Sequence, residues 1–330
     1  SKRGFAVGFD SDFTLGTDDR SFGEFRSYLA QDSDPQIDST GDTRDDPVDE
    51  QRYRISYQSQ TYLTEDIYLT TDINLLSDES LLEDFFKQEF VLDPQPDNVV
   101  ALTKWDELYT LTAIGRAQLN DFQETTERLP EIVLDIKRQN FFGTPVFYEG
   151  ETGIASLQLS RADDVRLPAL LPGEDPLTGV DLIQFRDLET TRFDTFHQFT
   201  YPRTYGGWFS FVPRAGIRAT YYSDSFNEDF ETTGGSDYRL IFNTGFEASF
   251  KLTKDYSDQI RSRAVGLDGL RHVFQPYSNF SLVADSGMDA DRVLQIDRLI
   301  ASTELPPLDF PQFTSIDSID NWSVWRLGMR

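Results

Sequence analysis

The clearest pattern in the chain is an alternation of apolar and polar side chains over residues 238–252, which read YRLIFNTGFEASFKL. Because successive side chains of a strand point to opposite faces, the alternation predicts one β-strand with an apolar face and a polar face. Ile241 is the one apolar residue on the polar parity. The segment is much longer than the usual strand of about five or six residues. The apolar parity comprises Leu240, Phe242, Thr244, Phe246, Ala248, Phe250 and Leu252.

The same alternation recurs along most of the sequence and predicts a series of antiparallel hairpins. We expect roughly 12 to 14 strands, with short turns alternating with long acidic loops. A helix of one or two turns is predicted within residues 77–86, which open with a Ser-rich N-cap pattern. The predicted strand pairs are residues 3–14 with 21–30, 53–63 with 67–75, 99–104 with 108–119, 132–138 with 146–160, and 193–201 with 208–222. Strands over 238–252 and 268–283 and a terminal strand over 321–330 follow.

Two architectures fit such strands. A soluble sandwich buries the apolar face between two sheets, whereas a transmembrane barrel turns it toward lipid and keeps the polar face in the lumen. A barrel strand needs about 9–11 residues to cross the membrane, which these segments supply. Aromatic residues recur near the strand ends, as the interfacial girdles of a barrel require. We therefore predict an all-β fold that is part of a large antiparallel transmembrane β-barrel. The aromatic residues near strand ends are Tyr53, Tyr62, Tyr201, Trp208, Tyr221, Tyr222 and Tyr238.

Composition narrows the classes of function. The 330 residues include 57 acidic and 30 basic side chains, for a net charge of -27, which argues against nucleic acid as a partner. Aromatic residues make up 14% of the chain, too many for an acidic disordered protein. Many aromatic residues among many acidic ones fit a barrel with long charged loops, and a halophilic or secreted β-protein would look similar. The chain contains no cysteine, so it has no thiol or disulfide chemistry.

Both ends of the sequence lie in strand-like patterns. Ser1 leads directly into an alternating segment, and the final ten residues also alternate. The sequence contains no run of about 18 apolar residues, so it predicts no transmembrane helix. We expect that residues 1–330 are part of a single outer-membrane barrel domain that is truncated at both ends.

Several short pieces, in this order, resemble the LptD family of lipopolysaccharide-assembly proteins of the outer membrane (OstA, organic solvent tolerance protein). A single three-residue match is weak, but the shared order extends across most of the chain. The sequence lacks the cysteines of that family and its periplasmic domain. The pieces are LSDESLLEDF over residues 76–85; Arg128, Leu129, Pro130 and Glu131; Arg192, Phe193 and Asp194 with Tyr201 and Pro202; and Leu270, Arg271 and His272 with Pro276.

The resemblance implies a barrel of about two dozen strands. It also implies a plug lipoprotein of the LptE type and a periplasmic Lpt bridge that delivers lipopolysaccharide. The lipid then leaves sideways into the outer leaflet of the bacterial outer membrane. This is translocation without a chemical reaction, so the resemblance predicts no enzyme and no catalytic residues. Two alternatives remain: another large barrel that acts as receptor or porin for small solutes, and a secreted all-β binding protein.

The candidate chemistry is sparse. The two histidines, His197 and His272, lie far apart and lack the spacing of a zinc site. A structural or lumenal hydrogen-bonding role is favoured for them over catalysis. Arg271 and His272 have opposite parity, so one of them faces the lipid margin and anchors the strand at the membrane interface. We predict no cofactor.

Two further sets of residues are candidates for binding. Arg239, Glu247 and Lys251 share the polar parity of their strand and are predicted to face the lumen, where ordinary solvation is favoured over guidance of an anionic glycolipid. The acidic segments have carboxylates suited to calcium, or to cations that bridge lipopolysaccharide phosphates, but none has EF-hand spacing. A solvated loop is the favoured interpretation of these segments. They are Asp10-Ser11-Asp12, residues 32–50 and residues 285–291.

Overall fold

The fold was analysed in a computed structural model of the chain. The structure describes residues 4–15, 20–37, 43, 48–162, 187–225, 235–256, 261–262, 264, 266–288, 292–297 and 316–329. Among these residues, no helix is long and apolar enough to span a bilayer. The connection between the first two predicted strands, at residues 16–19, and residues 163–186 lie outside the described part of the chain.

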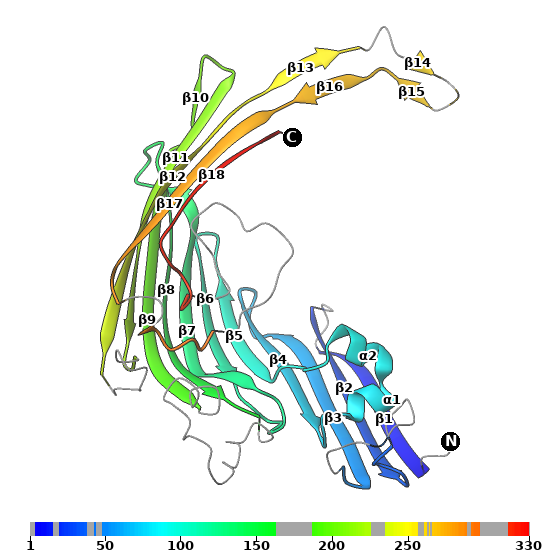
Figure 1. Ribbon diagram of the computed structural model, residues 1–330. Helices are drawn as coiled ribbons and strands as arrows, with labels where there is room; N and C mark the ends of the chain where they lie inside the picture. The colour runs from blue at the N-terminus through cyan, green and yellow to red at the C-terminus, as the bar shows by residue number, and fades with distance from the viewer. Residues whose placement is uncertain are drawn as a thin grey trace. The chain divides into compact units, whose positions relative to one another are not determined.

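Within the described residues, fourteen strands form one sheet, and they follow one another in chain order except for β10, which pairs only with β11 (Figure 1). Every strand pair whose register is described is antiparallel, so the predicted all-β antiparallel fold is confirmed. The strands are β1 (Gly4–Leu15), β2 (Ser21–Asp32), β3 (Gln51–Tyr62), β4 (Ile67–Leu76), β5 (Val99–Trp105), β6 (Tyr109–Arg116), β7 (Thr125–Asn140), β8 (Phe147–Ser160), β9 (Leu188–Thr200), β10 (Arg203–Tyr205), β11 (Phe209–Tyr222), β12 (Asp237–Phe250), β17 (Pro276–Gly287) and β18 (Trp322–Met329).

The connections alternate between short and long, as predicted. Residues 63–66 join β3 to β4 and residues 106–108 join β5 to β6, whereas residues 33–50 and 77–98 form the connections that follow β2 and β4. In an antiparallel meander, alternate connections lie at the same end of the sheet. Within these strands of unit 1, short turns therefore lie at one end and long loops at the other.

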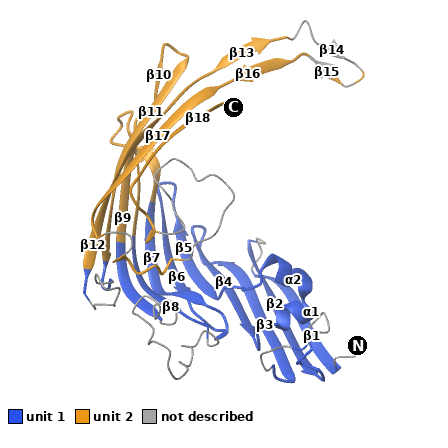
Figure 2. Cartoon of the chain, in the orientation of Figure 1, with its two compact units in different colours: residues 1–135, 153–193, 222–236 blue, residues 136–152, 194–221, 237–330 orange. Residues whose placement is uncertain are grey.

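The chain divides into two compact units (Figure 2). Unit 1 comprises residues 1–135, 153–193 and 222–236, and unit 2 comprises residues 136–152, 194–221 and 237–330. Strands β7, β8, β9 and β11 contribute residues to both units.

In unit 1 the apolar face of the strands is exposed. On β1, the side chains of Phe5, Val7 and Phe9 are 75%, 56% and 61% exposed. Arg52 and Arg54 of β3 lie on the other face of the sheet, and both are buried. A water-soluble sheet buries its apolar face, so this unit has the reverse arrangement.

Unit 2 shows the same reversal over the segment with the clearest sequence pattern. On β12, Arg239 and Asn243 are buried while Tyr238 and Phe242 are exposed, which confirms the two predicted faces. On β18, Trp325 is 69% exposed and lies opposite Phe280 of β17 in the register. We call the exposed side of each unit the apolar face and the covered side the polar face.

Two short helices, α1 (Leu81–Phe85) and α2 (Lys87–Leu92), cover the polar face of unit 1. Leu76, Leu81 and Leu82 form a small core there, against which Phe85, Phe86, Phe90 and Phe122 pack. The predicted helix is confirmed, but the predicted cap is wrong. The pattern placed the cap at Ser77, whereas the helix begins at Leu81 with Ser80 in the N-cap position. Ser80 makes no side-chain cap hydrogen bond, because its hydroxyl donates to Asp78 and accepts from Arg52.

The strand predicted over residues 268–283 is divided in two. Strand β16 (Arg271–Phe274) pairs with β13 (Leu252–Asp255) in a separate two-stranded arm, and β17 begins at Pro276. The register continues across the break, from Ser249 opposite Tyr277 to Leu252 opposite Phe274. Pro276 has no N–H to donate, so the ladder is interrupted where it would pair. A further short pair, β14 (Arg261–Ser262) with β15 (Leu267–Asp268), lies beyond the arm.

Two acidic segments differ from the prediction. Asp10 and Asp12 lie within strand β1 and not in a loop, because the alternation of apolar residues continues through them. The segment from residue 32 was expected to be fully hydrated, yet Asp32 ends β2 and is buried because Arg52 neutralises its carboxylate.

Candidate functional site: the polar face of the sheet

The polar face of unit 1 centres on a buried arginine of β3. The side chain of Arg52 is 0% exposed and its guanidinium contacts three carboxylates: Asp32 at 3.2 Å, Asp78 at 2.7 Å and Asp84 at 2.6 Å. The guanidinium also lies over the ring of Phe85, 5.0 Å from its centroid. These groups come from β2, from the loop after β4 and from α1, so one side chain fastens the helices to the sheet. We call this group the Arg52 cluster.

Asp78 lies in the loop before α1 and makes a two-point contact with Arg52, in which Nε and Nη2 donate to its two oxygens at 3.0 and 2.7 Å. Burial acts to raise the pKa of Asp78, but hydrogen bonds from Arg52 and Ser77 outweigh it and lower that pKa. The carboxylate is therefore charged throughout the physiological range, and the fastening is electrostatic as well as geometric.

A second arginine of β3 holds the second helix. Arg54 Nη2 lies 2.6 Å from Glu89 of α2, and its guanidinium lies 4.9 Å from the centroid of the Phe86 ring. Arg26 of β2 also pairs with Glu89, at 3.4 Å. These groups border a cavity of about 400 Å³ between α2 and strands β1 to β3. The cavity is lined mostly by charged side chains, so it is a polar hollow.

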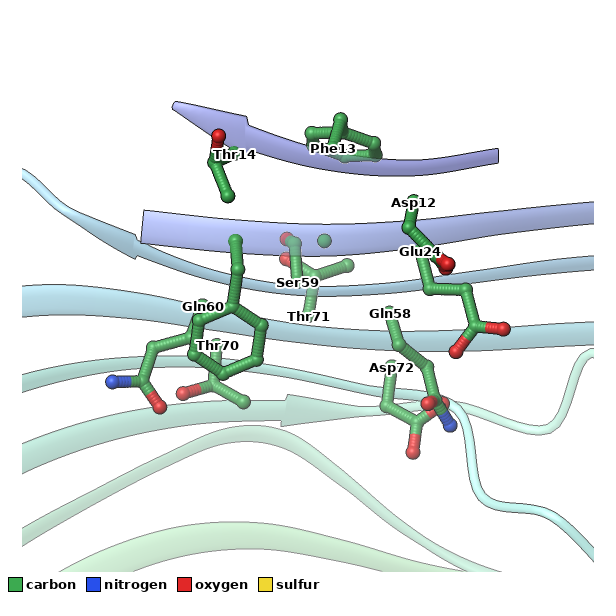
Figure 3. A pocket seen from close by; sticks show the side chains of 12 residues that line it. Asp12, Phe13, Thr14, Glu24, Gln58, Ser59, Gln60, Thr70, Thr71 and Asp72 are labelled. Atoms are coloured by element: carbon green, nitrogen blue, oxygen red, sulfur yellow. The ribbon is translucent and has the colours of Figure 1, made fainter. Parts of the chain in front are cut away.

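A larger hollow of about 630 Å³ lies beside it on β1 to β4 (Figure 3). The register places Asp12, Glu24, Gln58 and Asp72 in one row across the four strands, and Figure 3 shows these side chains on the same side of the sheet. Gln58 donates to Asp72 at 3.1 Å. The row suits water, hydrated cations or polar groups, whereas Phe13 and Phe22 line the same hollow with apolar surface.

The polar face of unit 2 carries a hydrogen-bonded ladder across neighbouring strands. Gln198 of β9 donates to Glu149 of β8 at 2.6 Å and accepts from Asn243 of β12 at 3.0 Å. Asp194 lies 3.3 Å from Arg218 of β11 and accepts from Thr220 at 2.6 Å. These contacts satisfy buried polar groups strand by strand.

The three residues predicted to face the lumen behave differently. Arg239 and Glu247 lie on the polar face of β12, with Arg239 buried and Glu247 half-buried. Lys251 follows the end of β12 and is exposed, at the point where the ladder breaks. The structure therefore places two of them on one face within a single strand and does not bring the third into contact with them.

The residues of the two resemblance motifs lie in different surroundings. Arg128 and Glu131 form an ion pair at 2.8 Å within β7, rather than in a segment before that strand. Leu270 precedes β16 and is exposed, and Arg271 and His272 are exposed on the arm, where Arg271 pairs with Asp255 at 2.9 Å. Pro276 opens β17, and Leu129 and Pro130 lie between the partners of the β7 ion pair.

His197 does not lie on the polar face. It shares the apolar face of β9 with Phe193 and Phe199, and its ring nitrogens lie 2.8 Å from the Tyr148 hydroxyl and 3.0 Å from the Thr195 hydroxyl. These hydrogen bonds agree with the structural role predicted for this histidine. In the described part of the chain, no group of three or more metal-ligating side chains is arranged to hold an ion.

No sequence signal marks the Arg52 cluster, because the three carboxylates are 20 to 32 residues from Arg52 and each is an ordinary member of a polar segment. Continuing the alternation of β3 back by one residue pair, from Arg54 to Arg52, could have placed both arginines on the polar face.

Comparison with known proteins agrees with the geometry. Residues 50–292 match the model of the LptD family, described as LPS transport system D. No curated protein matches the chain. The matched stretch is well over half of the 330 residues and includes Arg52, Asp78 and Asp84 of the Arg52 cluster, the helices and most of the sheet. The chain therefore belongs to the LptD family.

Proposed function

We propose that this chain is part of a closed β-barrel of the bacterial outer membrane that inserts lipopolysaccharide into the outer leaflet. One observation carries the proposal: both units expose the apolar face of their strands and cover the polar face. In water this arrangement leaves large aromatic side chains without partners, whereas in lipid it satisfies them. Membership of the LptD family supports lipopolysaccharide as the transported molecule.

The proposal assigns each face a task. The apolar face contacts lipid, and the polar face lines a lumen that a hydrophilic saccharide can enter. The arm of β13 and β16 carries Arg271 and His272 beyond the sheet, and we assign it to the membrane interface. Arg239, Glu247 and Lys251 are assigned to the lumenal side.

The proposal also names two partners of the chain and excludes a catalysed reaction. A plug lipoprotein of the LptE type would lie against the polar face, and a periplasmic bridge would deliver the lipid. No bond is made or broken in this function, so we propose that the protein is not an enzyme.

Depletion of the whole protein in its own bacterium tests the function. We expect newly made lipopolysaccharide to disappear from the cell surface and to accumulate inside, as measured by surface labelling of the lipid. Unchanged surface lipopolysaccharide with impaired uptake of a small solute would support the alternative of a receptor or porin. Recovery of the full-length protein in the aqueous fraction, without detergent, would support a secreted β-protein.

A further inference from the structure

The apolar face of unit 2 ends in a group of aromatic rings, where β11 begins and β12 ends. The ring centroid of Trp208 lies 5.8 Å from that of Phe250 and 5.9 Å from that of Phe209, and the Tyr205 ring lies 6.4 Å from Phe209. Trp208 and Tyr205 are 62% and 54% exposed. Exposed aromatic side chains of this kind are typical of the level at which a membrane protein meets lipid headgroups.

The arm of β13 and β16 continues the apolar face beyond these rings (Figure 1). The register of β12 with β17 places Phe246 opposite Phe280, and the same register on the arm places Leu252 opposite Phe274. Each arm residue is six positions from its counterpart on the sheet, so all four side chains lie on the same face. Leu252 and Phe274 are exposed. The arm therefore presents apolar side chains on the face that we propose contacts lipid.

Two residues farther along each strand, the same face becomes cationic. Lys254 lies opposite His272 in the register, and both side chains are exposed. The Cβ atoms of directly opposed residues are about 5 Å apart, so both side chains can reach one ligand. Lysine supplies an ammonium group, and histidine supplies an N–H donor in either protonation state. The pair lies about 7 Å beyond Leu252 and Phe274 along the arm.

The only acidic residue of β13 and β16 lies on the opposite face of the arm. Asp255 is opposed to Arg271 in the register, and the two form an ion pair at 2.9 Å. Their parity is the reverse of that of Lys254 and His272, so this carboxylate points away from the cationic pair. Of the two neighbouring residues Arg271 and His272, it is therefore His272 that lies on the lipid side.

Tyr256 and Leu270 continue this face on the far side of the cationic pair. The backbone N–H of Tyr256 donates to the carbonyl of Leu270 at 2.7 Å, which extends the same register. Nζ of Lys254 lies 4.9 Å from the centroid of the Tyr256 ring. Residues 251–274 contain five basic and three acidic side chains, in a chain with a net charge of -27. An anionic membrane surface repels an acidic protein, so this basic excess marks a place where contact is favourable.

We infer that the lipid-side face of the arm binds the phosphate of an anionic glycerophospholipid between Lys254 and His272. The acyl chains lie along Leu252 and Phe274, toward the aromatic end of the sheet. The pairing of an apolar surface with cations beyond it matches a lipid that has acyl chains and a charged headgroup.

The partner is a phospholipid of the membrane and not lipopolysaccharide, because of the end of the sheet at which the arm lies. The connections over residues 223–236 and 288–321 lie at the opposite end of β12 and β17. Outer-membrane barrels keep their long loops on the extracellular side and short turns on the periplasmic side. The inference rests on the proposed function for this orientation: with lipopolysaccharide in the outer leaflet, the arm meets the phospholipid of the periplasmic leaflet.

Photocrosslinking in vesicles tests the site without transport. The full-length protein is placed in vesicles of equal amounts of phosphatidylglycerol and phosphatidylcholine, with a photoreactive amino acid at Leu252 or at Thr253. These adjacent residues lie on opposite faces of the arm. We expect a lipid adduct at Leu252, mainly of phosphatidylglycerol, and little adduct at Thr253.

Removal of the cationic pair should abolish the preference for the anionic headgroup. Lys254→Gln with His272→Gln should lower the ratio of phosphatidylglycerol to phosphatidylcholine in the Leu252 adduct about tenfold. Arg271→Gln is the matched control, because it removes a cation from the same arm on the opposite face, and it should leave the ratio unchanged. The mobility of the protein before and after heating confirms that every variant is folded.

The outcomes separate the site from the function. Equal adducts at Leu252 and Thr253, no preference for phosphatidylglycerol, or equal effects of the double variant and Arg271→Gln would overturn the site. Vesicles in which lipopolysaccharide is added test the source of the lipid, and an adduct at Leu252 that is mainly lipopolysaccharide would overturn the assignment to phospholipid. The depletion experiment judges transport by surface lipopolysaccharide, so its failure would remove the function while the crosslinking still supports the binding site.

Discussion

Arg52 Nη1 and Asp84 Oδ2 lie 2.6 Å apart, and neither side chain is exposed to solvent. The two residues belong to a strand of the sheet and to a helix that lies on its polar face. A buried pair of this kind contributes little compared with apolar packing, but the loss of one partner leaves an unpaired charge in a place without water. The contact therefore determines where the helices attach rather than how stable the sheet is.

Replacement of Arg52 by glutamine should release α1 and α2 from the sheet. The change leaves Asp32, Asp78 and Asp84 without their shared cation, and we expect a local loss of about 3–5 kcal/mol. Hydrogen exchange of the amides of residues 81–92 in the membrane-embedded full-length protein measures it. Arg26→Gln is the matched control, because that ion pair is partly exposed and worth at most about 1 kcal/mol. Equal protection in both variants would contradict the assignment.

The attachment of the helices should also depend on pH. The pKa of Asp78 is lowered in the folded state, mainly because hydrogen bonds from Arg52 and Ser77 outweigh its burial. The stabilisation is therefore complete above the unfolded pKa, about 3.9, and is lost as the pH falls through the lower folded value. Hydrogen exchange of residues 81–92, corrected for the intrinsic effect of pH, should increase below about pH 4.

Asp78→Asn supplies the control for the pH dependence. It removes the titrating group, so exchange at neutral pH should already be faster and the additional increase at acid pH should be smaller. A wild-type protein whose exchange stays constant down to pH 2 would show that Asp78 does not govern the attachment.

The sheet was predictable because it depends on a period of two. Alternation alone placed Arg239 and Phe242 on opposite faces of β12, and the structure buries one and exposes the other. The division at Pro276 was harder to predict, since the apolar pattern continues across it and only the missing N–H interrupts the ladder. Periodicity indicates which way a side chain points but not whether its backbone group has a partner.

The sites were much less predictable. Arg52 meets Asp32, Asp78 and Asp84 only because the strands and α1 bring distant residues together, and no local spacing marks them. Ile241 was recognisable as an exception on the polar parity, but its partners Phe196, Val283 and Ile319 come from three other segments. A residue that breaks a strand pattern is thus a useful signal, although the sequence does not show what covers it.

Gly245 should tolerate no side chain. A Cβ at this position would lie 2.3 Å from the carbonyl oxygen of Phe280 on the paired strand, and a backbone atom in a ladder cannot move aside cheaply. We expect Gly245→Ala to destabilise the folded protein by about 1–3 kcal/mol, through displacement of β12 from β17. Urea unfolding in lipid vesicles measures the loss. Gly115→Ala on β6 is the matched control, because a Cβ there would lie 3.7 Å from its nearest neighbour, and we expect an effect of about 0.5 kcal/mol or less.

A charge on the apolar face distinguishes lipid from water as the surroundings of the sheet. Phe242 is 48% exposed on β12, and Phe242→Arg places a guanidinium where we propose that acyl chains lie. Near the bilayer midplane this should cost about 2–4 kcal/mol, measured by urea unfolding of the full-length protein in lipid vesicles. Glu247→Arg, on the polar face of the same strand, should cost less than about 1 kcal/mol because lumenal water solvates it. In a soluble protein, arginine at an exposed phenylalanine would change stability by only about 0.5 kcal/mol. Equal and small effects of the two variants would therefore contradict the proposal that lipid surrounds the apolar face, even though the chain belongs to the LptD family.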